Sequence, residues 1–243
     1  MSNFRISSWN IQGGSGPNPK YSALLNAADA YQSGIVLLQE AGSPGTTGLQ
    51  EGGVYGNYTC LIMRTDPTAK VERCSTGILV HNSLVSQVQA GDFRDDYNRP
   101  IPFIIYKNHI ITTIHAIADD SQSVAQVKAV LSRLNGEANP WILMGDFNSE
   151  PNRYPVNQMT LYPDRVNLIQ FAGTNRTAQY CNLIYPSSPT QGPKGTRVRT
   201  LDFAFASESL TRNLFPTILN DKIISNDGTV LSDHNFITLQ LDI

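Results

Sequence analysis

Four short polar clusters, each placed directly after an apolar run, constrain the fold of this chain more than any other feature. The clusters are Trp9-Asn10, Gln39-Glu40, Gly145-Asp146-Phe147-Asn148 and Ser232-Asp233-His234, and the runs before them are 4–8, 35–38, 141–144 and 229–231. Short apolar runs predict buried strands. In sheets packed against helices, ligands and reactive groups collect at strand ends. The pattern therefore predicts a site assembled from several strand ends that lie far apart in the sequence.

The order of the predicted elements indicates an α/β fold. Alternating side chains predict a strand at 4–8, and apolar residues at helical spacing over 21–31 precede the strand-like run 35–38. Turn-rich segments then separate further predicted strands at 54–62, 71–81, 102–106 and 110–114. The middle of the chain is therefore rich in sheet.

A second helix is predicted between 123 and 135. Its apolar face consists of Val124, Val127, Val130, Leu131 and Leu134. We expect a capping box of Ser123 and Gln126 at its start, and Asn135-Gly136 at its end. Strands at 141–144, 199–206 and 236–241 follow, separated by loops rich in proline and glycine.

The length of the chain is consistent with a single domain, and its net charge limits how it can bind phosphate. The 243 residues, 40% of them hydrophobic, suffice for one large core, and no repeat or linker divides the chain. We expect a single domain, 1–243. The net charge of −2 gives no general attraction to nucleic acid, so phosphate binding must depend on local basic residues or on a metal. No stretch reaches the roughly 20 apolar residues that cross a bilayer.

The three cysteines have no spacing typical of a zinc site. Cys60 and Cys74 flank the turn-like segment 64–68. Two alternatives stay open for this pair, a bridge across a hairpin or two buried free thiols.

Several motifs, taken in order, resemble those of one enzyme family. They are Ser8-Trp9-Asn10-Ile11-Gln12-Gly13, Leu38-Gln39-Glu40-Ala41-Gly42-Ser43, Asn98-Arg99-Pro100-Ile101, His115-Ala116-Ile117-Ala118, Gly145-Asp146-Phe147-Asn148-Ser149-Glu150-Pro151, Arg199-Thr200-Leu201-Asp202-Phe203 and Leu231-Ser232-Asp233-His234. The chain resembles the endonuclease/exonuclease/phosphatase superfamily of pancreatic deoxyribonuclease-like enzymes, and within it the catalytic subunits of cytolethal distending toxins. The resemblance implies a four-layer sandwich, two packed mixed β-sheets flanked by helices.

The residue chemistry independently suits phosphodiester hydrolysis. This reaction needs an activated water, a stabilised pentavalent anion and a neutralised leaving group, and Mg²⁺ held by oxygen ligands supplies the last two. Glu40 is the best candidate ligand, with Asn10 and Asp233 as its neighbours. We expect Mg²⁺ as the cofactor, with Mn²⁺ or Ca²⁺ as substitutes in vitro.

Two histidines, His115 and His234, suit proton transfer near neutral pH. The resemblance implies that both contact the scissile phosphate. It also implies that Asp202 orients His234, and that Asp146 and Asn148 lie close to the attacking water.

Three further residues are candidates for binding substrate phosphate. Arg99 matches a phosphate-contacting arginine of the toxin branch. A second arginine of that branch falls here on Asn82, which can donate a hydrogen bond but carries no charge. Arg199 belongs to a basic stretch with Lys194 and Arg197, for which backbone-phosphate binding and a solvated strand edge are equal alternatives.

The expected activity is a Mg²⁺-dependent deoxyribonuclease that damages DNA in target cells. The alternatives are a phosphatidylinositol phosphate phosphatase that uses the same site, or a catalytically weakened binding subunit. We expect DNA as the substrate, a monomer, and delivery subunits as in AB-type toxins, with 186–195 or 154–162 as contact surface. The native form is expected to be secreted, by an export signal that this sequence does not include, and to act in the nucleus of a target cell.

Overall fold

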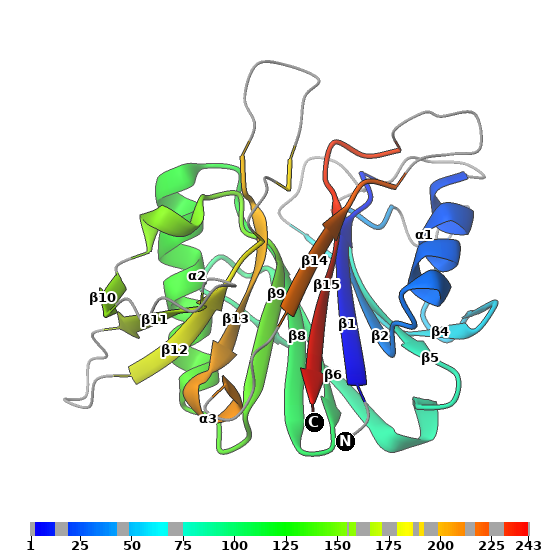
Figure 1. Cartoon of the computed structure of the whole chain (residues 1–243), viewed down its shortest axis with the longest axis horizontal. Helices are drawn as coiled ribbons and strands as arrows, with labels where there is room; N and C mark the ends of the chain where they lie inside the picture. The colour runs from blue at the N-terminus through cyan, green and yellow to red at the C-terminus, as the bar shows by residue number, and fades with distance from the viewer. Residues whose placement is uncertain are drawn as a thin grey trace.

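The computed structural model describes residues 3–12, 19–42, 49–67, 75–154, 156–158, 166–171, 179–186, 190–191, 199–211, 217–223 and 231–242. Within these ranges the chain forms two β-sheets that pack face to face, with one long helix on the outer face of each sheet (Figure 1). This arrangement confirms the predicted α/β class and the four-layer sandwich. No helix in the described ranges has the length and apolar character needed to span a membrane.

The first sheet has the strand order β14-β15-β1-β2-β5-β4-β3. Its strands are β1 (Asn3–Asn10), β2 (Ile35–Gln39), β3 (Val54–Tyr55), β4 (Tyr58–Thr65), β5 (Ser75–His81), β14 (Thr217–Asp221) and β15 (Phe236–Asp242). β1 and β2 are parallel, and helix α1 (Pro19–Ala30) connects them. β15 pairs with β1 in the antiparallel direction, so that β15 begins beside the end of β1.

The second sheet has the strand order β10-β11-β12-β13-β9-β8-β7-β6. Its strands are β6 (Val88–Arg94), β7 (Pro100–Tyr106), β8 (His109–His115), β9 (Trp141–Asp146), β10 (Val156–Gln158), β11 (Val166–Phe171), β12 (Gln179–Ile184) and β13 (Asp202–Ser207). β8 and β9 are parallel and are connected by helix α2 (Asp120–Asn135). Each sheet thus contains one β-α-β unit. Three shorter elements are the 3₁₀ turns η1 (Val85–Gln87) and η2 (Pro151–Arg153) and helix α3 (Glu208–Thr211).

The central strands are apolar on both faces because both faces are covered. In β2, Ile35 and Leu37 face the core between the sheets, whereas Val36 and Leu38 face the core under α1. β9 alternates in the same way: Ile142 faces the core between the sheets, and Leu143 faces the core under α2. Continuous apolar runs are typical of strands buried in this way. These runs fix the strand ends at which the polar clusters begin.

Helix α2 begins earlier than the sequence prediction. Asp119 is the N-cap, and its carboxylate accepts hydrogen bonds from the backbone N–H groups of Ser121 and Gln122. Ser123 and Gln126 lie inside the helix and are buried, so the predicted capping box is wrong. The C-cap is Gly136, which confirms the predicted end.

The predicted strand 54–62 is divided into a hairpin. Gly56 has a φ of +58°, in the left-handed region that glycine adopts without strain, and the turn it forms separates β3 from β4. The sequence patterns did not reveal β6, β10, β11, β12 or β14. β6 is an edge strand with mostly exposed or half-exposed side chains, and such a strand carries no apolar run.

The two described cysteines are free and buried. Cys60 lies in β4 opposite Leu79 of β5, and burial raises the pKa of its thiol to about 12. Cys181 is the other. Cys74 lies outside the described residues. The structure therefore favours the free-thiol alternative for Cys60.

Gly145 permits the close approach of β8 and β9 directly before Asp146. A Cβ atom at Gly145 would lie 2.2 Å from the backbone oxygen of Ile114, its partner in β8. Because backbone cannot move aside as a side chain can, we expect Gly145→Ala to lower the free energy of unfolding by about 1–3 kcal/mol. Urea denaturation of the variant measures this. Unchanged stability would contradict the close approach.

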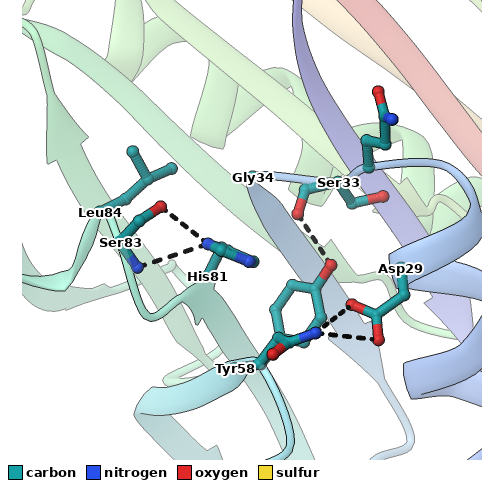
Figure 2. Close-up of a pocket in the computed structure, with 9 residues that line it drawn as sticks. Asp29, Ser33, Gly34, Tyr58, His81, Ser83 and Leu84 are labelled. Atoms are coloured by element: carbon teal, nitrogen blue, oxygen red, sulfur yellow. Dashed lines mark hydrogen bonds between the residues drawn. The ribbon is translucent and has the colours of Figure 1, made fainter.

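A cavity of about 470 Å³ opens at the far end of the first sheet, where β2 begins (Figure 2). It is lined by Asp29, Gln32, Ser33, Gly34, Asn57, Tyr58, His81, Ser83 and Leu84. The polar groups there largely bond to one another: Tyr58 Oη donates to Ser33 O at 2.9 Å, and Asn57 Nδ2 lies 3.2 Å from both carboxylate oxygens of Asp29. The cavity is separated from the polar clusters by the length of β2.

Candidate active site

Strand ends from both sheets meet on one side of the sandwich. Asn10 and Gln39 are register partners at the ends of β1 and β2. His115 and Asp146 are partners at the ends of β8 and β9, and Asp202, at the start of β13, pairs with Asp146 from the other side. The parallel β-α-β unit of each sheet thus delivers its carboxyl-terminal ends to the same place. The structure brings together the widely separated clusters, as the sequence predicted.

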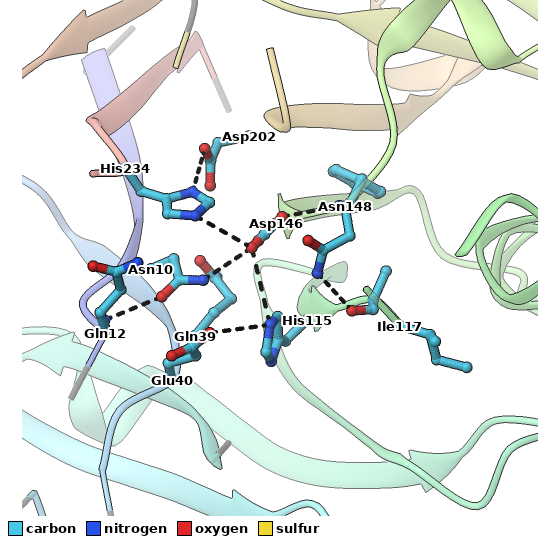
Figure 3. A network of polar contacts seen from close by, with 12 residues as sticks. Asn10, Gln12, Gln39, Glu40, His115, Ile117, Asp146, Asn148, Asp202 and His234 are labelled. Carbon is cyan, nitrogen blue, oxygen red and sulfur yellow. Dashed lines mark hydrogen bonds and ion pairs between the residues drawn. The ribbon is translucent and has the colours of Figure 1, made fainter. Parts of the chain in front are cut away.

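Asp146 lies at the centre of the polar network (Figure 3). Its Oδ2 accepts a hydrogen bond of 2.9 Å from Asn10 Nδ2, across the junction of the two sheets. Its Oδ1 accepts a 2.9 Å bond from the backbone N–H of Asn148. The Nε2 atoms of His115 and His234 lie 3.9 and 3.7 Å from Oδ2. Burial raises the pKa of Asp146, against the opposing effect of the nearby histidines.

His234 is held by a buried carboxylate. Its Nδ1 lies 2.8 Å from Asp202 Oδ2, and its backbone oxygen accepts a bond from Trp9 Nε1. Burial by itself would lower the pKa of His234, but the charges of Asp202, Asp146 and Asp233 outweigh burial and raise the pKa to about 10. His234 is therefore an imidazolium at neutral pH.

The raised pKa of His234 predicts that stability depends on pH. Because the pKa is higher in the folded than in the unfolded chain, the stabilisation is fully present below about 6.5 and is lost as pH rises through about 10. In EDTA, the free energy of unfolding should fall between pH 7 and 10 by on the order of 3 kcal/mol more in the wild type than in His234→Gln. Denaturant titrations at the two pH values measure this difference. Parallel curves would contradict the assignment.

His115 has the opposite titration behaviour. Burial is the main cause of its lowered pKa, and the charges of Arg99 and His234 lower the pKa further, against Asp146. Its Nε2 lies 3.6 Å from Glu40 Oε1. His115 is thus neutral at pH 7, beside an imidazolium on the other side of Asp146.

Several site residues sit at sharp backbone turns within two residues of a strand end. Gln12, Glu40 and Asn148 have φ angles of 47°, 46° and 49°, in the left-handed region that non-glycine residues rarely adopt. Such strain is concentrated at functional sites. The turns at Glu40 and Asn148 redirect the chain where it leaves the sheets, next to His115 and Asp146.

Gln39 links the two sheets underneath the site, a role that sequence reasoning missed. Its Nε2 donates to Ser8 Oγ at 3.0 Å and to Thr113 Oγ1, in the opposite sheet, at 2.7 Å. The side chain is fully buried. Gln39 stands in a quoted motif, but only its neighbour Glu40 had an obvious chemical use. Thr190 and Gln191 also contact site residues, Asp202 and Asp233, and the sequence indicated their segment, 186–195, only as a contact surface.

Arg99 lies beside the site and is partly buried. Its Nε forms a 3.0 Å ion pair with Asp66, and its guanidinium donates to the backbone oxygen of His115 at 3.1 Å. The carboxylate of Asp95 accepts instead from the Arg99 backbone N–H. The ion pair with Asp66, a residue distant in sequence, therefore holds the Arg99 guanidinium next to the end of the strand that carries His115.

Of the other two candidate phosphate contacts, Asn82 lies away from the site and Arg199 lies beside it, bridged to Gln191. Asn82 follows β5, and β5 runs antiparallel to β2, so Asn82 lies at the end of the first sheet opposite Glu40. Its side chain bonds to Thr59 and Gly56. The structure thus contradicts Asn82 as a phosphate ligand, because the strand before it points away from the site. Arg199 forms a 3.6 Å ion pair with Glu150. Lys194 and Arg197 lie outside the described residues.

A buried cluster of Asp146, Asp202 and His234 is a candidate metal site. Each residue offers one ligand atom, and these atoms lie within 4.8 Å of one another. His234 would bind a metal in this position only after its Nε2 lost a proton, since an imidazolium cannot be a ligand, and its Nδ1 would keep the hydrogen bond to Asp202.

The oxygen set of Asn10, Glu40 and Asp233 has the chemistry that Mg²⁺ prefers. Asp233 Oδ1 is buried and accepts no hydrogen bond from the described residues, and the positive charge of His234, at Nε2, lies 3.8 Å away, beyond hydrogen-bond distance. A buried carboxylate oxygen without a donor is costly unless a cation compensates it. The residues present therefore fit a divalent cation at this junction.

Comparisons with known proteins agree with this geometry. Residues 7–234 match the model of the endonuclease/exonuclease/phosphatase family. The chain is 26% identical over 239 residues to one of the subunits of the Escherichia coli cytolethal distending toxin, and the alignment covers 86% of this chain and 81% of that protein.

Solved structures share the fold. The Haemophilus ducreyi cytolethal distending toxin aligns with a TM-score of 0.59 and 18% identity, over 99% of this chain and 98% of that chain. A humanized D. rerio TDP2 aligns with a TM-score of 0.65 and 16% identity over the whole of both chains. Since the family model spans nearly the whole sequence, this chain belongs to the endonuclease/exonuclease/phosphatase family.

Proposed function

We propose that the protein is a Mg²⁺-dependent deoxyribonuclease that acts as a single catalytic domain. The observation that carries the proposal is the pair of histidines on either side of Asp146, whose environments shift their pKa values in opposite directions. Groups whose pKa values are pushed apart are typical of an acid and a base in one site. Family membership limits the chemistry to phosphate ester hydrolysis.

The two histidines take different roles in the proposed mechanism. Neutral His115 accepts the proton of the attacking water, which Asp146 and Asn148 orient. The imidazolium of His234 donates its Nε2 proton to the departing oxygen, and Asp202 holds the ring and stabilises its charge. Arg99 contributes positive charge for the scissile phosphate. The rate should fall at low pH as His115 gains a proton and at high pH as His234 loses one.

Glu40, Asn10 and Asp233 are the residues that we propose as holding the cation. A bound Mg²⁺ supplies electrostatic stabilisation of the phosphate charge in the transition state. We favour this set over Asp146, Asp202 and His234 because Mg²⁺ binds oxygen and because His234 then keeps the Nε2 proton that the proposed mechanism uses. The chain's own contribution is to hold the three oxygens at one strand-end junction.

The similarity to a cytolethal distending toxin also suggests where the protein acts and how it gets there. Because the relative in Escherichia coli is one subunit of a toxin, we propose a secreted protein that reaches its target cell with delivery subunits, in an AB-type assembly. Its DNA substrate would then be attacked in the target cell nucleus. The contact surfaces expected at 154–162 and 186–195 lie largely outside the described residues.

Two substrates offered side by side test the proposal. Purified protein with Mg²⁺ is given supercoiled plasmid, and phosphate release from an inositol phospholipid is measured in parallel. The expected result is nicking of the plasmid. Phosphate release without nicking would replace the nuclease with the lipid phosphatase. If the protein shows no nicking and no phosphate release, the remaining alternative is a binding subunit with a weakened site.

A further inference from the structure

We propose that Thr190 is a positioning residue that sets the bond between Asp202 and His234. The proposal rests on the hydrolytic function proposed above and adds a residue from outside the recognised motifs. Asp202 begins β13 in one sheet, whereas His234 precedes β15 in the other. Strand pairing within a sheet therefore cannot set the distance between them, and another connection is needed.

Thr190 is tied to the sheet that carries Asp202. Its side-chain Oγ1 accepts hydrogen bonds of 2.9 Å from the backbone N–H groups of both Leu201 and Asp202. The backbone adds three more bonds, because the N–H groups of Thr190 and Gln191 donate to Arg199 O, and the N–H of Arg199 donates to Gln191 O. One hydroxyl thus fixes the backbone of the residue that orients the catalytic imidazole.

The same segment is tied to the strand end that carries His234. Thr190 O accepts a 2.7 Å bond from the backbone N–H of Asn235. Gln191 forms a β-bridge with His234, and its side-chain Nε2 donates to Asp233 Oδ2 at 3.5 Å. The two residues therefore cross the junction between the sheets as a strap.

Burial makes the hydroxyl of Thr190 hard to replace. Its exposed fraction is 0%, and the amides that it accepts from are buried with it. Loss of the hydroxyl would leave two buried N–H groups without this acceptor, and a buried donor without a partner drives local rearrangement. The displaced group would be Asp202, so the 2.8 Å bond to His234 Nδ1 would lengthen or break.

The test compares Thr190→Val, which keeps the shape and removes the hydroxyl, with Thr190→Ser, which keeps the hydroxyl. Thr112→Val is the matched control, because Thr112 is as fully buried as Thr190, and its hydroxyl donates to a backbone oxygen, Pro102 O, of the neighbouring strand β7. The first readout is the low-field NMR resonance of the His234 Nδ1 proton, assigned by its loss in His234→Ala. The second is kcat and KM for plasmid nicking.

We expect Thr190→Val to lose or shift the Nδ1 resonance and to lower kcat by roughly 10- to 100-fold, as loss of an outer-shell partner typically does. KM should stay close to wild type, Thr190→Ser should restore both readouts, and Thr112→Val should keep the resonance. A wild-type resonance and wild-type kcat in Thr190→Val would overturn the proposal. If the wild type shows no hydrolysis while Thr190→Val still loses the resonance, positioning by Thr190 stands and the proposed function fails.

Discussion

Replacing His234 by alanine is expected to lower the rate of phosphodiester hydrolysis by roughly 10²–10⁴-fold. The imidazole is the proton donor of the proposed mechanism, and Asp202 and Asp146 hold it between two carboxylates at 2.8 and 3.7 Å. No other histidine of the described ranges can take its place, because His115 already faces Asp146 from the opposite side and is neutral at pH 7. The rate of plasmid nicking under saturating Mg²⁺ measures the effect.

The control for this variant must separate chemistry from folding. His234→Ala also removes the positive charge of the imidazolium, which compensates the buried carboxylates around it. Some loss of stability is therefore expected together with the loss of activity. His109→Ala is the matched histidine variant, because His109 begins β8 at the end away from His115 and bonds to Lys107 O. It should keep wild-type turnover. A folded His234→Ala protein with wild-type turnover would contradict the proposed role.

Replacing Glu40 by glutamine is expected to have the second-largest effect. A neutral amide in place of the proposed carboxylate ligand would weaken the cation site, and a bound cation would supply several kcal/mol of charge stabilisation in the transition state. At a Mg²⁺ concentration that saturates the wild type, the rate should fall by roughly 10²-fold or more. Part of the loss should return at higher Mg²⁺, because the defect is in metal affinity.

Glu137 offers the matched carboxylate for this comparison. It lies exposed just after α2 and its backbone N–H bonds to Leu134 O. Glu137→Gln should therefore keep both turnover and the Mg²⁺ dependence of the wild type. Isothermal titration of Mg²⁺ into Glu40→Gln, Glu137→Gln and wild type measures affinity without turnover. Equal affinities in all three proteins would place the cation away from Glu40.

The elements with strong periodicity could be predicted from the sequence. β1, α1 and β2, and again α2 and β9, were expected because both faces of their strands are buried and their helices carry one apolar face. Strands whose side chains are only partly buried could not be predicted in this way. β6 is an edge strand, and its half-exposed side chains leave no apolar run to detect.

The site was predictable to the extent that its residues directly follow buried strands. Asp146 and Glu40 were expected for this reason, and the structure delivers them to one junction. Arg99 was placed near phosphate by resemblance, but its partner Asp66 depends on tertiary contact alone. Thr190 acts through backbone bonds to β13, and no pattern of residue types records such bonds. Asn82 was misplaced because alignment of a motif does not reveal the direction of the strand before it.

Addition of Mg²⁺ back to EDTA-treated protein is the most direct measurement of the central claim, that the strand-end junction is a metal-dependent site for hydrolysing phosphodiesters. Wild type and His234→Ala are each assayed for nicking of supercoiled plasmid, without metal and after Mg²⁺ is restored. We predict nicking by the wild type only when Mg²⁺ is present, and almost none by the variant in either condition. Equal nicking with and without Mg²⁺, or equal nicking by the two proteins, would contradict the account.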